Sequence, residues 1–205
     1  SYGVNRADLI AIKGALLGHL VGRFGSANDP DRTQAIDEFP PLKTESHVRQ
    51  FVGSSNWVRR YLYSIYPTAI KILGEWMRPD VKFPPEGLGG CDPPTKGCKA
   101  YKCVKLLCKH SITLAVMDEA SAIDGSRPLE QIADACGIAW GSTNVQMLPD
   151  LTGFKVLLMV GKGFTPAQQA WSALSLDAFA QLSGKCMQKM ILGLMRSLCW
   201  TDHAN

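Results

Sequence analysis

Four cysteines and one histidine cluster in the middle of the chain, and thiolate and imidazole are groups with which proteins bind zinc. These residues are Cys91, Cys98, Cys103, Cys108 and His110. Six, four and four residues separate the successive cysteines, without a Cys-x-x-Cys pair, and this spacing fits no common zinc module. Cys103 and Cys108 lie five residues apart on an expected helix, so they do not share a face. We therefore expect no metal site here.

The cysteine count also bears on the redox state of the chain. Seven cysteines are an odd number, and they lack the regular spacing of a small disulfide-rich secreted domain. We therefore expect reduced thiols in an intracellular compartment, and no disulfide.

Lysines recur around these cysteines, and the charge of the chain is uneven. Residues 1–110 hold 16 Lys and Arg against 10 Asp and Glu, whereas residues 111–205 hold 6 against 8. A basic first half is suited to a polyanion such as RNA, held through phosphate contacts. We take Lys99, Lys102 and Lys105 as candidate RNA-binding residues, with a solvated helix face as the alternative explanation.

Length and composition restrict the class of protein. The 205 residues are 46% hydrophobic and 20% charged, as in a globular protein of one large or two small domains. No segment reaches the roughly 18 to 20 consecutive apolar residues of a membrane-spanning helix, so we expect no membrane partner.

The first part of the chain has helical patterns after a short hairpin. Asp29 followed by Pro30, and Thr44, are start signals for helices. A segment with five prolines and three glycines follows at residues 78–94, and such composition is typical of a linker. The expected elements are a hairpin at 9–21, a loop at 25–30, a helix that starts at Pro30 and ends by Pro40, and further helices from 44, at 57–66 and at 67–76.

The second part mixes strands with one long helix. Thr165, Pro166 and Gln168 have the spacing of a capping box with proline at the first helical position, and Ala170, Leu174, Asp177 and Ala178 mark one face of the helix. The expected elements are a helix at 99–109, strands at 129–134, 137–147 and 153–160, a helix from 165 to about 192, and a strand at 194–201. These patterns predict an α+β fold.

The order of motifs in the first half resembles a known family. The segments Leu16–Val21, Lys43–Thr44, Val48–Gly53 and Asn56–Tyr61 are similar to the end of the palm and the thumb of reverse transcriptases from gypsy-type long-terminal-repeat retrotransposons. The family has an FLGH strand pair, a PKT helix start, and an FLG followed by YRRF at matching spacing.

The second half resembles the next part of the same polyprotein. Ala100–Leu107 is similar to its connection helix, Pro128–Gly137 to the first strand of its ribonuclease H domain, and Phe164–Ser172 to the start of that domain's long helix. The resemblance implies a helical thumb-like region at 1–77, a Pro/Gly-rich linker at 78–98, and a connection helix with a truncated ribonuclease H-like α/β domain, a mixed sheet with one long helix, at 99–205.

Ribonuclease H cleaves the RNA of an RNA–DNA hybrid with two metal ions held by four carboxylates. The resemblance places three of them at Asp134, at Asp177 where the family has Glu, and at Asp202, and it places the fourth after Asn205. Asp is shorter than Glu by one methylene, about 1.5 Å, which is large for metal ligation. We expect these carboxylates to be vestigial and no cofactor to bind, with Mg²⁺ as the cofactor if ribonuclease H activity persists.

The thumb resemblance bears on nucleic-acid binding. Arg49, Arg59 and Arg60, interleaved with Trp57 and Tyr61, could bind RNA through phosphate contacts and stacking. The alternative is that the aromatic rings belong to the thumb core and the arginines are solvated. Tyr-x-Asp-Asp, the polymerase motif, is absent from the chain. We expect His19 and His47 to be structural, because neither has a nucleophile nearby.

Together these features favour a domesticated, catalytically inactive retroelement fragment. We expect it to serve as a structural or RNA-contacting subunit of a large ribonucleoprotein, with an organellar, mitochondrial ribosome as the candidate assembly. Its partners would be RNA, specifically rRNA, and neighbouring protein subunits that cover the C-terminal sheet. The alternative is the ribonuclease H portion of a retrotransposon polyprotein.

Overall fold

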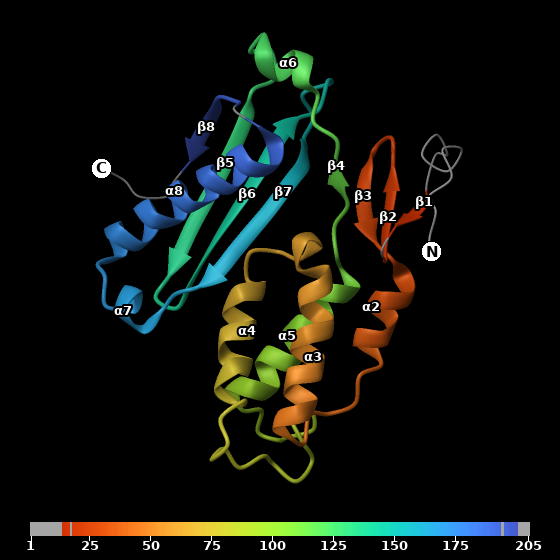
Figure 1. The fold of residues 1–205 in the computed structure, drawn as a ribbon, viewed down its shortest axis with the longest axis vertical. Helices are drawn as coiled ribbons and strands as arrows, with labels where there is room; N and C mark the ends of the chain where they lie inside the picture. The colour runs from red at the N-terminus through yellow and green to blue at the C-terminus, as the bar shows by residue number, and fades with distance from the viewer. Residues whose placement is uncertain (1–13, 17, 194, 201–205) are drawn as a thin grey trace.

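The computed structural model describes residues 14–16, 18–193 and 195–200. It is a mixed α+β fold in which a group of helices lies against one end of a four-stranded sheet, and a smaller sheet flanks both (Figure 1). Residues 9–13 and Leu17 of the expected hairpin, and Asp202, lie outside the described residues.

The smaller sheet joins segments that are far apart in sequence. It consists of β1 (Gly14–Leu16), β2 (His19–Gly22), β3 (Gly25–Asn28) and β4 (Leu114–Ala115), paired antiparallel in that order. The hairpin is confirmed over the described residues, but the loop expected at 25–30 is wrong because β3 occupies it. Gly25 has φ 147° and permits β4 to approach, since a Cβ there would overlap the carbonyl oxygen of Leu114.

Four helices and one 3₁₀ turn form the helical part. They are α2 (Pro30–Asp37), α3 (Glu45–Val58), η1 (Arg59–Tyr61), α4 (Tyr66–Glu75) and α5 (Lys96–Lys109). The side chains of Asp29 and Thr44 cap α2 and α3 as predicted. The separate helix expected at 57–66 is wrong: α3 continues to Val58, and the carbonyl of Tyr61 accepts a hydrogen bond from the Ile112 N–H at 3.0 Å where the chain leaves the helix.

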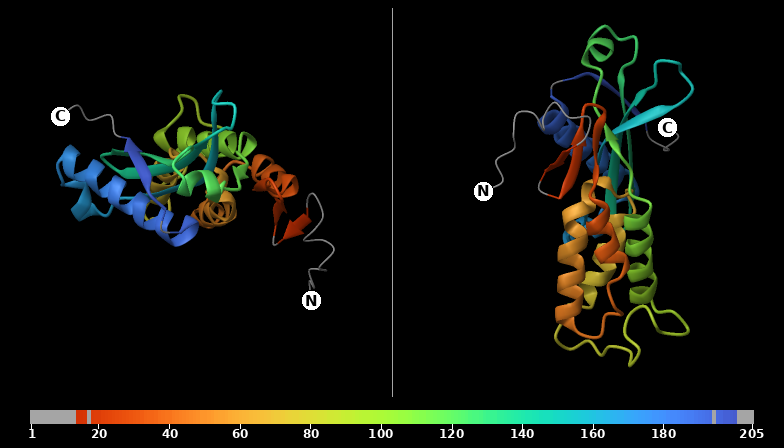
Figure 2. Two further views of the ribbon diagram at one scale, coloured as in Figure 1. Left: turned by 90° about the horizontal axis from the view of Figure 1, so that it is seen from above. Right: turned by 90° about the vertical axis from the view of Figure 1, so that its right-hand side faces the viewer.

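The Pro/Gly-rich segment folds back onto these helices. Leu88 is fully buried and pairs with Leu42 across an isolated bridge. Helix α5 then packs into the same core as α3 and α4, through Ala100, Tyr101 and Val104 (Figure 2, right). The packing thus groups α5 with the helices before the segment, and the domain division at 78–98 stays a prediction.

The segment contains a disulfide that the sequence analysis did not expect. Cys91 and Cys98 are joined, with their Cα atoms 6.8 Å apart. The expectation of no disulfide is therefore wrong for this pair, because the loop turns back to the first turn of α5, where Thr95 caps the helix and Cys98 points at Cys91. The other five cysteines are free thiols.

The larger sheet confirms the predicted meander and fourth strand. Its strands are β5 (Leu129–Cys136), β6 (Ala139–Met147), β7 (Phe154–Gly163) and β8 (Ser197–Trp200), in the order β7-β6-β5-β8. The β5–β6 and β6–β7 pairs are antiparallel, and β8 pairs parallel with β5. Among the described strands, β7 and β8 are therefore the two edges. A short helix, α6 (Glu119–Ile123), precedes β5.

One long helix covers a face of this sheet (Figure 1). The capping box at Thr165 is confirmed, but the helix it starts, α7 (Pro166–Gln169), is short. The Ser172 side chain then accepts the Ser175 N–H and caps a second helix, α8 (Ala173–Leu192). The prediction of one uninterrupted helix is wrong for this reason.

The inward face of α8 also differs from the predicted one. Of the predicted face only Asp177 is buried, and Leu174 is exposed. The face that meets the sheet consists of Leu176, Asp177, Ala180, Gly184 and Gln188. Gly184 allows close contact, because a Cβ there would lie 2.6 Å from both Ser142 Cβ and Gln131 Nε2.

Candidate functional site

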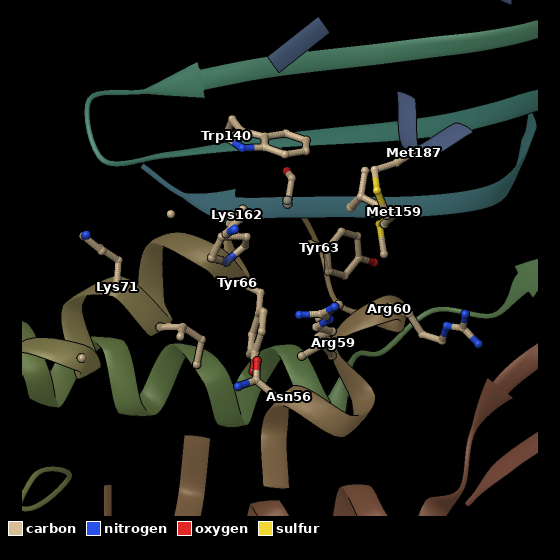
Figure 3. A pocket seen from close by; sticks show the side chains of 18 of the residues that line it. Asn56, Arg59, Arg60, Tyr63, Tyr66, Lys71, Trp140, Met159, Lys162 and Met187 are labelled. Atoms are coloured by element: carbon tan, nitrogen blue, oxygen red, sulfur yellow. The ribbon is translucent and has the colours of Figure 1, made fainter. Parts of the chain in front are cut away.

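A groove separates the helical part from the edge strand β7 (Figure 3). Its volume is about 940 Å³. The residues of η1 and α4 form one wall, while β7 and the second half of α8 form the other (Figure 3). The two walls are in contact at Gly161 of β7, where the absence of a side chain leaves room for α4. A Cβ at Gly161 would lie 2.8 Å from Pro67 Cγ.

The groove is strongly basic. Only one acidic residue, Glu75, contributes to the described lining, against five basic ones. The basic residues are Arg59, Arg60, Lys71, Arg78 and Lys162. The Lys71 ammonium donates to the Phe164 carbonyl at 3.0 Å, whereas Arg59, Arg60 and Lys162 are exposed. This excess of positive charge in a concave surface attracts anions.

The floor of the groove contains a polar cluster under Tyr66. The Tyr66 hydroxyl donates to Asn56 Oδ1 at 3.1 Å and lies 2.9 Å from Ser55 Oγ. Burial of the ring raises the pKa of Tyr66 far above its usual value, so this phenol stays protonated. The cluster fixes the floor as a neutral, hydrogen-bonded surface below the charged rim.

Apolar side chains line the groove between the cations. They come from both walls: Tyr63 and Ile70 from the helical side, Met159 from β7, and Met187 and Ile191 from α8. Tyr63 is 46% exposed and Ile191 is also 46% exposed. Because the described sheet ends at β7, the strand also presents unpaired backbone N–H and C=O groups on this side.

The six predicted RNA-binding residues do not form one patch. Arg59 and Arg60 line the groove, and Figure 3 shows the Arg60 guanidinium directed away from Tyr63. Arg49 is on α3 and forms an ion pair with Glu45 at 2.6 Å. Lys99 and Lys102 are exposed on α5, while the Lys105 ammonium donates to the Phe39 carbonyl at 2.8 Å and lies over the Tyr101 ring.

Sequence analysis missed the other groove cations. Lys71, Arg78 and Lys162 stand alone among uncharged or acidic neighbours, and no spacing connects them with Arg59. Lys162 lies near Lys71 only because β7 packs beside α4, although β7 comes about ninety residues later in the chain. The sequence indicated only the adjacent pair Arg59 and Arg60, which stands between the aromatic residues Trp57 and Tyr61.

The aromatic residues next to Arg59 and Arg60 differ in their burial. Tyr61 is fully buried, which favours the core alternative for that ring. Trp57 is 50% exposed and stacks on His19, with 5.8 Å between ring centroids. Burial, and secondarily the nearby Arg60 and Arg32, lowers the pKa of His19. His47 lies on the first turn of α3, where its Nδ1 accepts the Lys43 N–H at 3.5 Å.

Two of the three predicted carboxylates meet on the larger sheet. Asp134 Oδ1 and Asp177 Oδ1 accept from the same Ala135 N–H, at 2.8 and 3.1 Å. Asp177 is only 7% exposed, so its carboxylate supports the attachment of α8 to β5. Asp202 lies outside the described residues.

Of the predicted metal ligands, the described residues hold two, Asp134 and Asp177. A two-metal site needs carboxylates that converge on the ions with open coordination positions, whereas Asp177 is buried and bonded to backbone. Across residues 14–16, 18–193 and 195–200 no three His, Cys, Asp or Glu side chains group so as to hold a metal ion. Within the cysteine cluster, Cys91 and Cys98 are joined in the disulfide and Cys108 is buried on α5.

Comparison with known proteins shows what this fold is similar to. No family model and no curated protein sequence matches the chain. A structure of the foamy viral protease-reverse transcriptase dRH with double-stranded DNA aligns with a TM-score of 0.68 and 12% identity, over 94% of this chain and 31% of that one. The foamy viral protease-reverse transcriptase with an RNA/DNA hybrid aligns at 0.65 and 14%, over 89% and 22%.

A third structure, of the same viral protein with double-stranded DNA, aligns at 0.65 and 12%, over 94% of this chain and 37% of that one. The chain thus spans between 22% and 37% of the chains it matches. Its fold is similar to that of part of the foamy viral protease-reverse transcriptase. Within the described residues, no helix is both long and apolar enough to cross a bilayer.

Proposed function

We propose that this chain is a retroelement-derived nucleic-acid-binding domain, and that nucleic acid binds in the groove between η1–α4 and β7. The observation that carries the proposal is the charge of that groove, in which five basic residues face one acidic residue. Phosphates are the natural counterpart of such a surface. The structural neighbours were determined with double-stranded DNA and with an RNA/DNA hybrid, which supports the same class of ligand.

We further propose that binding takes place without ribonuclease H catalysis. The support is the identity and burial of Asp177. This residue stands where the family has Glu, and its buried carboxylate accepts a hydrogen bond from the Ala135 N–H. One observation favours the alternative, two-metal hydrolysis of an RNA–DNA hybrid: Asp134 and Asp177 converge on one N–H. Incubation of a labelled hybrid with the protein and Mg²⁺ or Mn²⁺ decides between them, and cleavage that Asp134→Asn abolishes would overturn the inactive assignment.

We propose that the chain is a domesticated fragment of a gypsy-type retroelement that serves in a large ribonucleoprotein. The candidate assembly is the mitochondrial ribosome, and the proposed ligand is rRNA. Support comes from α8 and β8, which expose apolar side chains on opposite faces of the larger sheet and so suit protein neighbours. Large apolar side chains are exposed there: Leu182, Met190, Leu198 and Trp200. β8 is also an edge strand in the described sheet, and such edges are commonly covered in assemblies.

Binding by the groove is testable with two matched double variants. Fluorescence anisotropy with a labelled RNA–DNA hybrid gives the affinity at several salt concentrations. Arg59→Ala/Arg60→Ala removes two groove cations, and we expect weaker binding and a salt slope that is shallower by about 2. Lys99→Ala/Lys102→Ala makes the same charge change on α5 and serves as the control, with a smaller loss. Equal losses in both variants, or none in the first, would contradict the proposal.

A further inference from the structure

We propose that the groove binds a single-stranded segment of nucleic acid, with unstacked bases inside and phosphates on the rim; this inference rests on the proposed function. The neighbours' structures contain duplexes, and the groove has features that a duplex does not use. Its size, its apolar lining and its free strand edge each point to exposed bases.

The size of the groove limits its occupant. About 940 Å³ lies at the upper end of the range of pockets that enclose a small ligand, about 300 to 1,000 Å³. Such a space holds a few nucleotides of one strand. It is too small to enclose a duplex, which has two strands with their bases paired between them. A duplex would touch only the rim and leave the interior unfilled.

The lining suits base faces. A duplex presents phosphates and sugars outward and keeps its base faces stacked inside, so apolar side chains gain little from it. Tyr63 offers a half-exposed ring and the half-buried Met187 lines the same cavity, whereas Met159 is only 5% exposed and adds little surface. Among the described residues, no other ring stacks on Tyr63. Aromatic rings stack on bases of any sequence, and thioethers make favourable contacts with rings.

The rim and the strand edge complete the site. Arg59, Arg60 and Lys162 are exposed and line the groove from both walls, so a strand's phosphates can follow the rim while its bases point inward. The free edge of β7 offers backbone donors and acceptors to base edges. Figure 3 shows Arg59 beside Tyr63, with Met159 and Met187 on the facing wall. A ring beside cations is the usual arrangement of a single-strand binding surface.

The test compares one RNA sequence in three forms: single-stranded, as an RNA duplex, and as an RNA–DNA hybrid, with the full chain in an anisotropy assay at fixed salt. We expect the single strand to bind at least tenfold more tightly than either duplex. Tyr63→Ala should weaken single-strand binding about tenfold, as expected for the loss of one stacked base, and Tyr63→Phe should keep it. Trp171→Ala, which removes an exposed ring outside the groove, is the matched control and should have no effect.

The outcomes separate this inference from the function on which it rests. Duplex binding that equals single-strand binding, depends on Arg59 and Arg60, and is indifferent to Tyr63→Ala would overturn the inference and leave the proposed function intact. If none of the three nucleic acids binds, both the inference and the proposed function are overturned. The same holds if the groove binds only an acidic peptide. Far-UV circular dichroism and urea midpoints equal to wild type establish that the variants are folded.

Discussion

Replacing Gly184 by alanine tests how closely α8 sits on the sheet. An added Cβ would overlap Ser142 Oγ and lie 2.6 Å from both Ser142 Cβ and Gln131 Nε2. Ser142 Cβ is fixed to the backbone of β6, one of the two central strands of the sheet, and so cannot move alone. The Gln131 amide is fully buried and donates to the Gln181 carbonyl at 2.8 Å, so its displacement would break a buried hydrogen bond.

The magnitude follows from two opposing effects. Overpacking of a close contact costs about 1 to 3 kcal/mol, while alanine in a helix interior is favoured over glycine by about 0.5 to 1 kcal/mol. We therefore expect Gly184→Ala to lower the free energy of unfolding by about 1 kcal/mol from the midpoints of these ranges, and by about 2.5 kcal/mol at most. For a chain of this length a loss of about 1 kcal/mol lowers the melting temperature by about 2 to 4 °C.

The control is the same substitution where space is open. A Cβ at Gly53, in the middle of α3, would meet nothing within 4 Å, so Gly53→Ala should gain about 0.5 to 1 kcal/mol from helix propensity alone. Urea unfolding followed by far-UV circular dichroism measures both. A Gly184→Ala variant as stable as Gly53→Ala would refute the close packing of α8 on β6.

Three further predictions concern the cap of α3, the half-buried imidazole of His19 and the disulfide. Thr44→Ala should cost about 1 kcal/mol in urea unfolding, because the Thr44 hydroxyl accepts the His47 N–H; an unchanged midpoint would argue against the cap. Because burial lowers the pKa of His19, the unfolded chain binds its proton first, so stability should fall as pH drops through 6.5 and below. His19→Gln should reduce that dependence, and an identical pH profile would contradict it. Thiol titration of the denatured, unreduced protein should find five thiols of seven cysteines, with Cys91 and Cys98 missing; seven would exclude the disulfide.

The elements that the sequence predicts well are those with local signals. The caps at Asp29, Thr44 and Thr165 each act within three residues, and the three-strand meander has its turns between the strands. Strand β3 was missed because its sequence, Gly25–Asn28, has little strand propensity, although it pairs with the adjacent β2 as well as with the distant β4. The break at Ser172 was missed because a serine can cap a helix or sit inside one, and packing decides which.

The site was predicted only in part for the same reason. Arg59 and Arg60 stand next to each other, so the sequence displays them, whereas Lys162 reaches the groove only through the pairing of β7 in the sheet. The resemblance identified Asp134 and Asp177, and the structure does bring their carboxylates to one N–H. That Asp177 is buried there depends on how α8 packs, which periodicity along the helix did not show.

Photo-crosslinking tests the central claim, that nucleic acid lies in the groove, most directly. A single-stranded RNA with 4-thiouridine is bound to the full chain and irradiated, and the crosslinked peptides are identified by mass spectrometry. We predict crosslinks in residues 59–63 and 158–163, from the two walls of the groove, and their loss in Arg59→Ala/Arg60→Ala. Crosslinks confined to α5 or to β1–β3, with none in either wall, would contradict the account.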